Sequence, residues 1–155
     1  MSADIFIPAR TSGHGQFTVD IYHEKAGWGY SGLRVVELEA GASQALETGD
    51  SELLVLPLAG SATVNVDGRD YELAGRPGVF QAVTDYLYVG RGKGLTITSA
   101  AGGLFAFPSA VASKDLPTAY YPKETVRIDL RGAGDCSRQV NNYCLAVEGV
   151  TTSHL

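Results

Sequence analysis

The stretch ELLVLPLAGSATVNVDGRDYEL, residues 52–73, carries the signals that decide the fold. Its first part, residues 52–58, is apolar at successive positions after Glu52, which is typical of a β-strand covered on both faces. Residues 61–67 alternate apolar and polar side chains, the pattern of a strand with one buried face. Asp67-Gly68 then predicts a hairpin turn, because glycine tolerates the positive φ of a primed turn.

Similar patterns continue on both sides of this stretch. Residues 17–22 and 125–130 alternate in the same way, and YLYV at residues 86–89 is apolar throughout. Short glycine-bearing breaks separate the segments, and they lie at residues 48–50, 59–60, 75–78 and 90–94. Apolar residues nowhere recur with helical spacing over three turns, so the sequence predicts an all-β sandwich or barrel.

The organisation changes toward the C-terminus. Residues 109–122 are expected to form an irregular loop, because Pro108, Pro117 and Pro122 oppose helix continuation. The sequence after this loop predicts one clean strand at residues 125–130. It is followed by a glycine- and arginine-bearing loop at 131–138 and an apolar run at 143–147. The sequence stops at Leu155 without a polar tail, which favours a fragment whose partner segment is left off.

Composition narrows the class of protein. The chain has 155 residues, of which 45% are hydrophobic, enough for one domain with a buried core. Its net charge of −5 argues against a nucleic-acid partner. No apolar run approaches the ~20 residues of a membrane span, and residues 1–10 lack the pattern of a secretory signal. Two cysteines, Cys136 and Cys144, are too few for a disulfide scaffold, so we expect a cytoplasmic protein with reduced thiols.

The three histidines give no metal-binding pattern. His14, His23 and His154 lie far apart in the sequence, and none forms an HxH or HxxxH pair. A catalytic metal site usually takes three protein ligands, so a metal site in this chain is not expected. His14 and His23 are expected to be solvated. GRGKG at residues 90–94 lacks the Ser or Thr of a phosphate loop and is interpreted as a turn.

Two arginines and a group of tyrosines are the candidate ligand-binding residues. Arg131 and Arg138 flank the glycine-rich loop, and arginine can grip a carboxylate with two parallel hydrogen bonds, which suits an acidic sugar. Tyr86, Tyr88, Tyr120 and Tyr121 could line a carbohydrate-sized pocket. Arginines beside turns are also common without a role, and tyrosine often serves β-strand packing alone. The candidate substrate-binding set is Arg131, Arg138 and Tyr88, with no catalytic residue assigned.

Residues 52–68 and 78–92 resemble the two cupin motifs. The resemblance implies a cupin-type double-stranded β-helix, a jelly-roll barrel. In this alignment Leu46, Thr48 and Leu95 occupy the positions of cupin metal-binding histidines, and Glu52 alone remains of the four ligands. The resemblance therefore implies a metal-free barrel.

A more specific resemblance runs from about Gly27 to the C-terminus. Several stretches of this region are similar to the N-terminal half of the 5-deoxy-glucuronate isomerase family. They are AGWGY at residues 26–30, LEAG at 38–41, TGDSE at 48–52, GRPGVF at 75–80, and RGAG at 131–134 leading to RQVNN at 138–142. The chain departs from the family at Phe80-Gln81 and Val89-Gly90. This family of myo-inositol catabolism consists of bicupins, so the resemblance implies a barrel at residues 1–122, with closing strands and the start of a connection to an absent second cupin domain at 123–155.

The resemblance also implies a function. Such enzymes are aldose–ketose isomerases that convert 5-deoxy-D-glucuronate to 2-deoxy-5-keto-D-gluconate, with their divalent metal in the second barrel. No cofactor is expected in this chain, which alone should have little or no activity. We expect a small-molecule sugar acid as ligand and a homo-oligomer, with strand exchange near residues 144–150. Two alternatives stay open: a non-catalytic metal-free cupin module that binds a sugar acid or serves oligomerisation, and an unrelated jelly-roll lectin.

Overall fold

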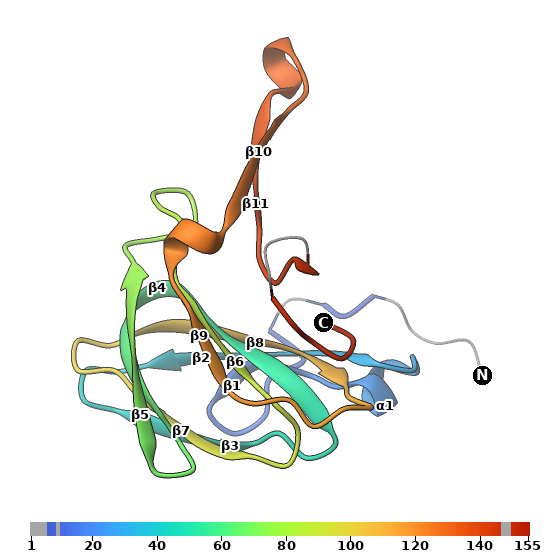
Figure 1. The fold of residues 1–155 in the computed structure, drawn as a ribbon, viewed down its shortest axis with the longest axis vertical. Helices are drawn as coiled ribbons and strands as arrows, with labels where there is room; N and C mark the ends of the chain where they lie inside the picture. The colour runs from blue at the N-terminus through green and yellow to red at the C-terminus, as the bar shows by residue number, and fades with distance from the viewer. Residues whose placement is uncertain (1–5, 9, 147–149) are drawn as a thin grey trace.

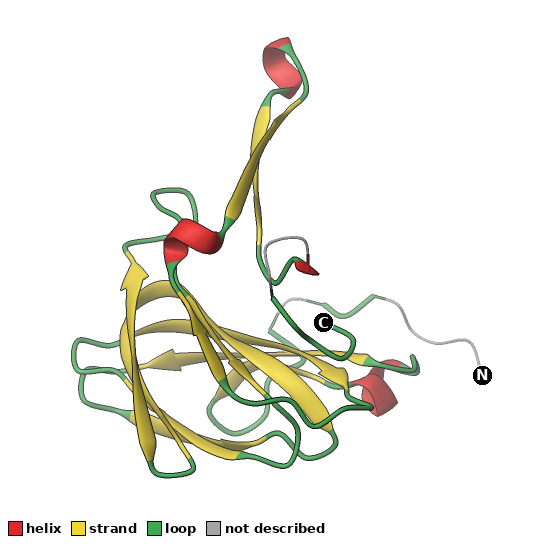
Figure 2. Ribbon diagram, in the orientation of Figure 1, coloured by secondary structure: helices red, strands yellow, loops and turns green. Residues whose placement is uncertain are grey.

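A computed structural model describes residues 6–8, 10–146 and 150–155. β-strands dominate these residues, and the helices are short (Figure 2). The elements are β1 (Phe17–Ile21), α1 (His23–Ala26), β2 (Ser31–Leu38), β3 (Ser43–Glu47), β4 (Ser51–Val66), β5 (Arg69–Arg76), β6 (Tyr86–Val89), β7 (Gly94–Thr98), β8 (Gly103–Val111), β9 (Ala119–Tyr121), the 3-10 turn η1 (Lys123–Thr125), β10 (Arg127–Arg131), the 3-10 turn η2 (Gly134–Cys136) and β11 (Arg138–Asn142). No helix of the described residues is long and apolar enough to cross a membrane. The expected absence of a secretory signal concerns residues 1–10, of which 1–5 and 9 lie outside the described residues.

The strands form two antiparallel layers that share β4. One layer has the order β1-β2-β8-β4-β6-β9, and in the other β3 pairs with β7, β7 with β4, and β4 with β5. The first half of β4 pairs with β6 and β8, and its second half pairs with β5 and β7. Figure 1 shows the two layers curving around a common interior. The all-β, cupin-type jelly-roll fold is confirmed.

The deciding stretch forms one long strand and a hairpin. Asp67 and Gly68 adopt φ values of 51° and 82°, so the predicted hairpin between β4 and β5 is confirmed. The predicted break at residues 59–60 is wrong, because β4 continues through it. Register shifts between Pro57 and Ala59 and between Gly60 and Ala62 mark a bend instead, where β4 passes from one layer to the other.

Two further boundaries differ from the sequence-based expectation. The segment expected to be a loop at residues 109–122 includes the end of β8 and all of β9. β9 pairs with β6, and this contact with a distant strand outweighs the local effect of the prolines. The strand expected at residues 125–130 begins at Arg127, because Thr125 closes the 3-10 turn η1.

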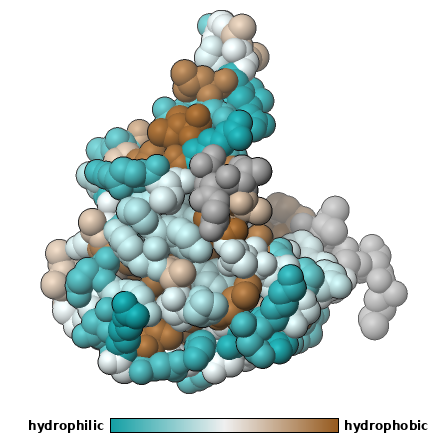
Figure 3. All heavy atoms as spheres, in the orientation of Figure 1, coloured by the Kyte–Doolittle hydropathy of each residue, from teal (hydrophilic) through white to brown (hydrophobic). Residues whose placement is uncertain are grey.

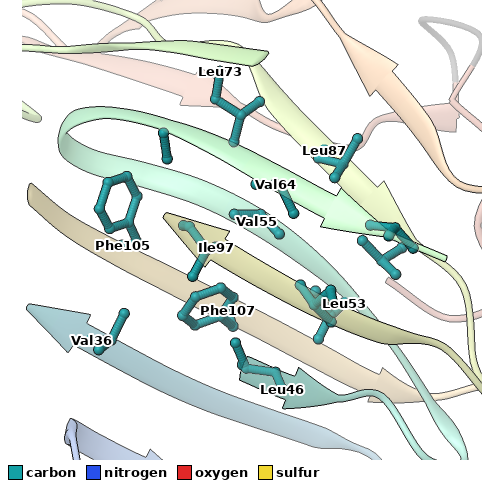
Figure 4. Close-up of a cluster of buried hydrophobic side chains, with 14 of the residues drawn as sticks. Val36, Leu46, Leu53, Val55, Val64, Leu73, Leu87, Ile97, Phe105 and Phe107 are labelled. Atoms are coloured by element: carbon teal, nitrogen blue, oxygen red, sulfur yellow. The ribbon is translucent and has the colours of Figure 1, made fainter. Parts of the chain in front are cut away.

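The core fills the space between the layers. Inward-facing side chains from β2 to β8 meet there, and Figure 4 shows Val36, Leu46, Val64, Ile97 and Phe107 among them. A second apolar cluster lies on the outer face of β4 and β6, where Leu54, Tyr86 and Tyr88 pack against residues of the C-terminal segment. All four residues of β6 are buried. This outer cluster explains why β6 and the start of β4 are apolar on both faces.

The β10–β11 hairpin projects away from the barrel (Figure 1). Its strands form a separate two-stranded sheet, with Arg127 opposite Asn142 and Arg131 opposite Arg138. Hydrophobic side chains lie exposed along it (Figure 3), and Ile128 and Leu130 are 50% and 81% exposed. A lone hairpin is only marginally stable in water, so this element would gain from a covering partner.

Candidate functional site

The barrel interior is apolar where the cupin resemblance places metal ligands. Leu46 on β3 and Leu95 on β7 are cross-strand partners, and both belong to the buried core. Thr48 is also buried, and its hydroxyl oxygen accepts a hydrogen bond from the backbone N–H of Lys93 at 2.8 Å. These side chains do not fit a transition-metal site. Among the described residues, no group of three or more His, Cys, Asp and Glu side chains could hold a metal ion.

Glu52, the one remaining residue of the cupin ligand set, lies on the opposite side of the wall. Its neighbour Leu53 belongs to the inner core, whereas Glu52 meets Tyr88 of the outer face. Its carboxylate is fully buried and accepts the Tyr88 hydroxyl at 2.6 Å and the backbone N–H groups of Ser153 and Leu155 at 2.8 Å each. The backbone N–H of His154 also donates to it. Glu52 therefore binds polypeptide, not the barrel interior.

The pKa values around this carboxylate follow from its contacts. Burial raises the pKa of Glu52, but the hydrogen bonds from Tyr88 and the three backbone N–H groups outweigh burial and hold the pKa below its ordinary value. Burial and the hydrogen bond to Glu52 raise the pKa of Tyr88. Burial, with a contribution from the charge of Glu52, raises the pKa of Cys144 to about 11. The cluster thus holds a carboxylate with a neutral phenol and a neutral, unreactive thiol beside it.

A polar cavity of about 250 Å³ opens at one end of the barrel. β1, α1, β2 and the β3–β4 turn supply most of its lining, which includes Asp20, His23, Arg34, Asp50 and Ser109. Arg34 lies opposite Asp20 in the β1–β2 register, on the same face of β2 as the core. Desolvation lowers the pKa of Arg34, and the nearby Asp20 charge partly opposes this shift. The cavity can hydrogen-bond a small polar molecule, and sequence reasoning did not find it because its residues carry no motif.

Arg131 and Arg138 come together at the tip of the β10–β11 hairpin. They are cross-strand partners and, with Leu130, line a hollow of about 350 Å³. Arg131 donates to Asp129 at 3.0 Å, and Arg138 donates to the carbonyl oxygen of Cys136 at 3.3 Å. Arg131 and then Arg127 lower the pKa of Asp129. This face of the hairpin therefore carries positive charge in excess of its single carboxylate.

Tyr88 does not share this hollow. It is 1% exposed, and its hydroxyl is committed to Glu52. Tyr86 is also buried and stacks on Tyr121 with 5.1 Å between ring centroids. Tyr120 is more exposed and donates its hydroxyl to Asp85 at 2.9 Å. The structure thus brings together the two arginines of the candidate set and separates them from the tyrosine.

The histidines and cysteines lie in different environments. The side chain of His14 is 87% exposed, whereas that of His23 is 20% exposed and lines the polar cavity. His154 approaches the Ser113 hydroxyl at 3.1 Å and packs on Tyr30. Cys136 and Cys144 are free thiols.

Comparison with known proteins assigns the family. The model of the KduI/IolB family matches residues 5–155. The chain belongs to the KduI/IolB family. The 5-deoxy-glucuronate isomerase of Geobacillus kaustophilus is 28% identical over 140 residues, which cover 89% of this chain and 51% of that protein. The 5-deoxy-glucuronate isomerase of Listeria innocua is 30% identical over 140 residues, 88% of this chain and 51% of the relative.

A solved structure agrees with this assignment. The KduI/IolB chain superposes on an IolB-like protein from Salmonella typhimurium LT2 with a TM-score of 0.77 and 26% identity, over 84% of this chain and 51% of that one. The chain spans about half the length of the curated relatives it matches. The resemblance stated from the sequence is therefore confirmed at the level of the family.

Proposed function

We propose that this chain is the N-terminal cupin half of an isomerase of myo-inositol catabolism that converts 5-deoxy-D-glucuronate to 2-deoxy-5-keto-D-gluconate. The family match over residues 5–155, together with relatives named 5-deoxy-glucuronate isomerase, supports the proposal. The share of the relatives that is covered, about half, fits one barrel of a two-barrel protein.

The proposed division of labour follows from the reaction. Aldose–ketose isomerisation moves a proton between neighbouring carbons through an enediolate, and it needs a general base and an electrophile that stabilises the developing oxyanion. In this barrel Leu46 and Leu95 fill the positions where cupins hold such an electrophile. We therefore place the divalent metal and the reacting groups in the second barrel, and give this half the role of scaffold and of one wall of the cleft.

The chain alone is expected to show no measurable turnover of 5-deoxy-glucuronate with added zinc or manganese. A protein that contains this barrel joined to the second barrel of the family is expected to turn over the substrate. An isomerase assay on both proteins checks this. Robust turnover by the chain alone would overturn the division between the barrels, and inactivity of the two-barrel protein would overturn the isomerase assignment.

The hairpin arginines are the proposed contacts of this half to a sugar acid. Arg131 and Arg138 lie side by side, and arginine forms charge-assisted hydrogen bonds with a carboxylate. Their present partners, Asp129 and a backbone carbonyl, leave donors available for a ligand. Tyr88 remains in the proposal only as support of the outer wall, since it is buried.

Millimolar glucuronate is expected to shift the NMR signals of Arg131 and Arg138 in the 155-residue chain. The Arg138→Gln variant should weaken this binding about tenfold, because it removes one charged donor of the pair. Arg69→Gln is the matched control, since Arg69 lies on β5 and packs over Tyr71. Equal effects of the two variants would show that the arginine pair is not a ligand site.

Location and assembly complete the proposal. A cytoplasmic protein suits sugar-acid catabolism, and the net charge of −5 disfavours nucleic acid as a partner. Self-association remains part of the proposal, supported by the exposed Ile128 and Leu130 of the hairpin. The strand exchange expected near residues 144–150 involves residues 147–149, which lie outside the described residues.

A further inference from the structure

On the outer face of the barrel, the carboxylate of Glu52 is hydrogen-bonded mainly to backbone N–H groups. Glu52 is fully buried, and three of its four hydrogen-bond donors are successive backbone N–H groups, those of Ser153, His154 and Leu155. The fourth donor is the Tyr88 hydroxyl at 2.6 Å. These contacts join β4 to a segment about 100 residues further along the chain.

The physical chemistry favours a binding role for this arrangement. An ionised carboxylate is costly to bury unless charge-assisted hydrogen bonds satisfy its oxygen atoms. Successive backbone N–H groups that converge on one point form a cradle for an anion. Glu52 supplies that anion from the barrel, so the two groups satisfy each other. Because the donors are backbone groups, the contact does not depend on the side chains that the segment carries.

Side chains of the same segment add weaker contacts. The Ser153 hydroxyl accepts a hydrogen bond from the backbone N–H of Ser113 at 2.9 Å, and the His154 ring packs on Tyr30 with 5.5 Å between centroids. Leu155 joins the outer apolar cluster. His154 and Ser153 are more exposed than Glu52, so their side chains are peripheral to the buried carboxylate.

We propose that Glu52 and Tyr88 form a backbone-binding clasp, a site on the outer wall of the barrel that holds the segment 153–155 through its peptide N–H groups. Glu52 occupies the position of a metal-binding residue in the cupin motif, but here its side chain lies on the other face of the strand. Glu52 is the anchor of the clasp, because it accepts all the donors. Tyr88 is a positioning residue, because its hydroxyl orients the carboxylate and caps one oxygen atom.

Paired substitutions at His154 separate backbone from side-chain binding. His154→Pro removes the N–H that donates to Glu52, whereas His154→Ala keeps it and removes only the ring contacts. We expect the amides of Ser153 and Leu155 to exchange with solvent at least about tenfold faster in His154→Pro, and near the wild-type rate in His154→Ala. Hydrogen exchange of the 155-residue chain, followed by NMR, gives these rates.

Glu52→Gln tests the same contact from the barrel side. It keeps the size of the side chain and removes its charge, so the amides of Ser153, His154 and Leu155 should also exchange about tenfold faster. The amides of β6 serve as the folding control. If Glu52→Gln does not fold, Tyr88→Phe is the second variant, with a smaller acceleration expected at the same three amides. Equal rates in His154→Pro and His154→Ala, or unchanged protection in the variant of the clasp, would overturn the proposal.

Discussion

Replacement of Gly75 with alanine is expected to be among the most destabilising single substitutions in the barrel. Gly75 has a φ of 67°, and a Cβ atom added there would overlap the carbonyl oxygen of Gly60. The atoms that this Cβ would meet belong to the backbone of Gly60 and Ser61, where β5 runs against the bend of β4, so no flexible side chain can turn aside. A left-handed alanine costs roughly 1–2 kcal/mol, and forcing the strands apart adds about 1–3 kcal/mol. Denaturant unfolding followed by circular dichroism measures the loss.

Gly68→Ala is the matched control for this prediction. Gly68 has a φ of 82°, and nothing lies within 4 Å of a Cβ atom placed on it. The conformational penalty is therefore similar, about 1–2 kcal/mol, but the steric part is absent. Gly75→Ala should lose clearly more stability than Gly68→Ala. Equal losses would mean that the bend of β4 can move and that the close passage of the two strands is not a fixed feature of the fold.

The same region shows how far the sequence determines the fold. The period-two pattern and Asp67-Gly68 predicted the hairpin, and the apolar run at residues 86–89 coincides with β6. The glycine at position 60 predicts a chain break, whereas the structure has a bend within β4 there. Glycine marks both features, because both need its backbone freedom, and only the pairing of the flanking residues with β5 and β8 tells them apart.

The candidate functional site is harder to predict from the sequence than the fold. Tyr88 and Glu52 are 36 residues apart, and the segment that Glu52 binds is about 100 residues away, so no local pattern joins them. The sequence pattern does not show which way Glu52 points, because the run that follows it is apolar at successive positions. The register shifts within β4 change which positions face inward, so that Leu53 and Val55 join the core and Glu52 lies on the outer face. The polar cavity around Arg34 has no spacing signal, because β1, α1, β2 and the β3–β4 turn meet only in the folded chain.

Histidines placed at two of the three cupin histidine positions, those of Leu46 and Leu95, should damage this barrel without creating a metal site. In the Leu46→His, Leu95→His double variant, two aliphatic side chains that are 4% and 3% exposed become imidazoles. Each loses about 1.5–3 kcal/mol of apolar burial, and each polar ring without a partner costs about 1–3 kcal/mol more. The total is of the order of the whole stability of a small domain. Thermal unfolding should show a partly or wholly unfolded chain.

The response of the double variant to added zinc shows whether the two introduced histidines form a metal site. A stable zinc site needs about four ligands, and the barrel interior would offer only two, because Glu52 lies on the other face and is held by Tyr88 and the C-terminal segment. Added zinc should therefore neither restore folded structure in the double variant nor raise its melting temperature. The Leu46→Met, Leu95→Met double variant is the matched control. It keeps the volume and polarity of the side chains and should lower the free energy of unfolding by less than about 3 kcal/mol in total. A zinc-dependent rise in melting temperature for the histidine variant would show that the interior can still assemble a ligand set, and that the outward orientation of Glu52 does not prevent it.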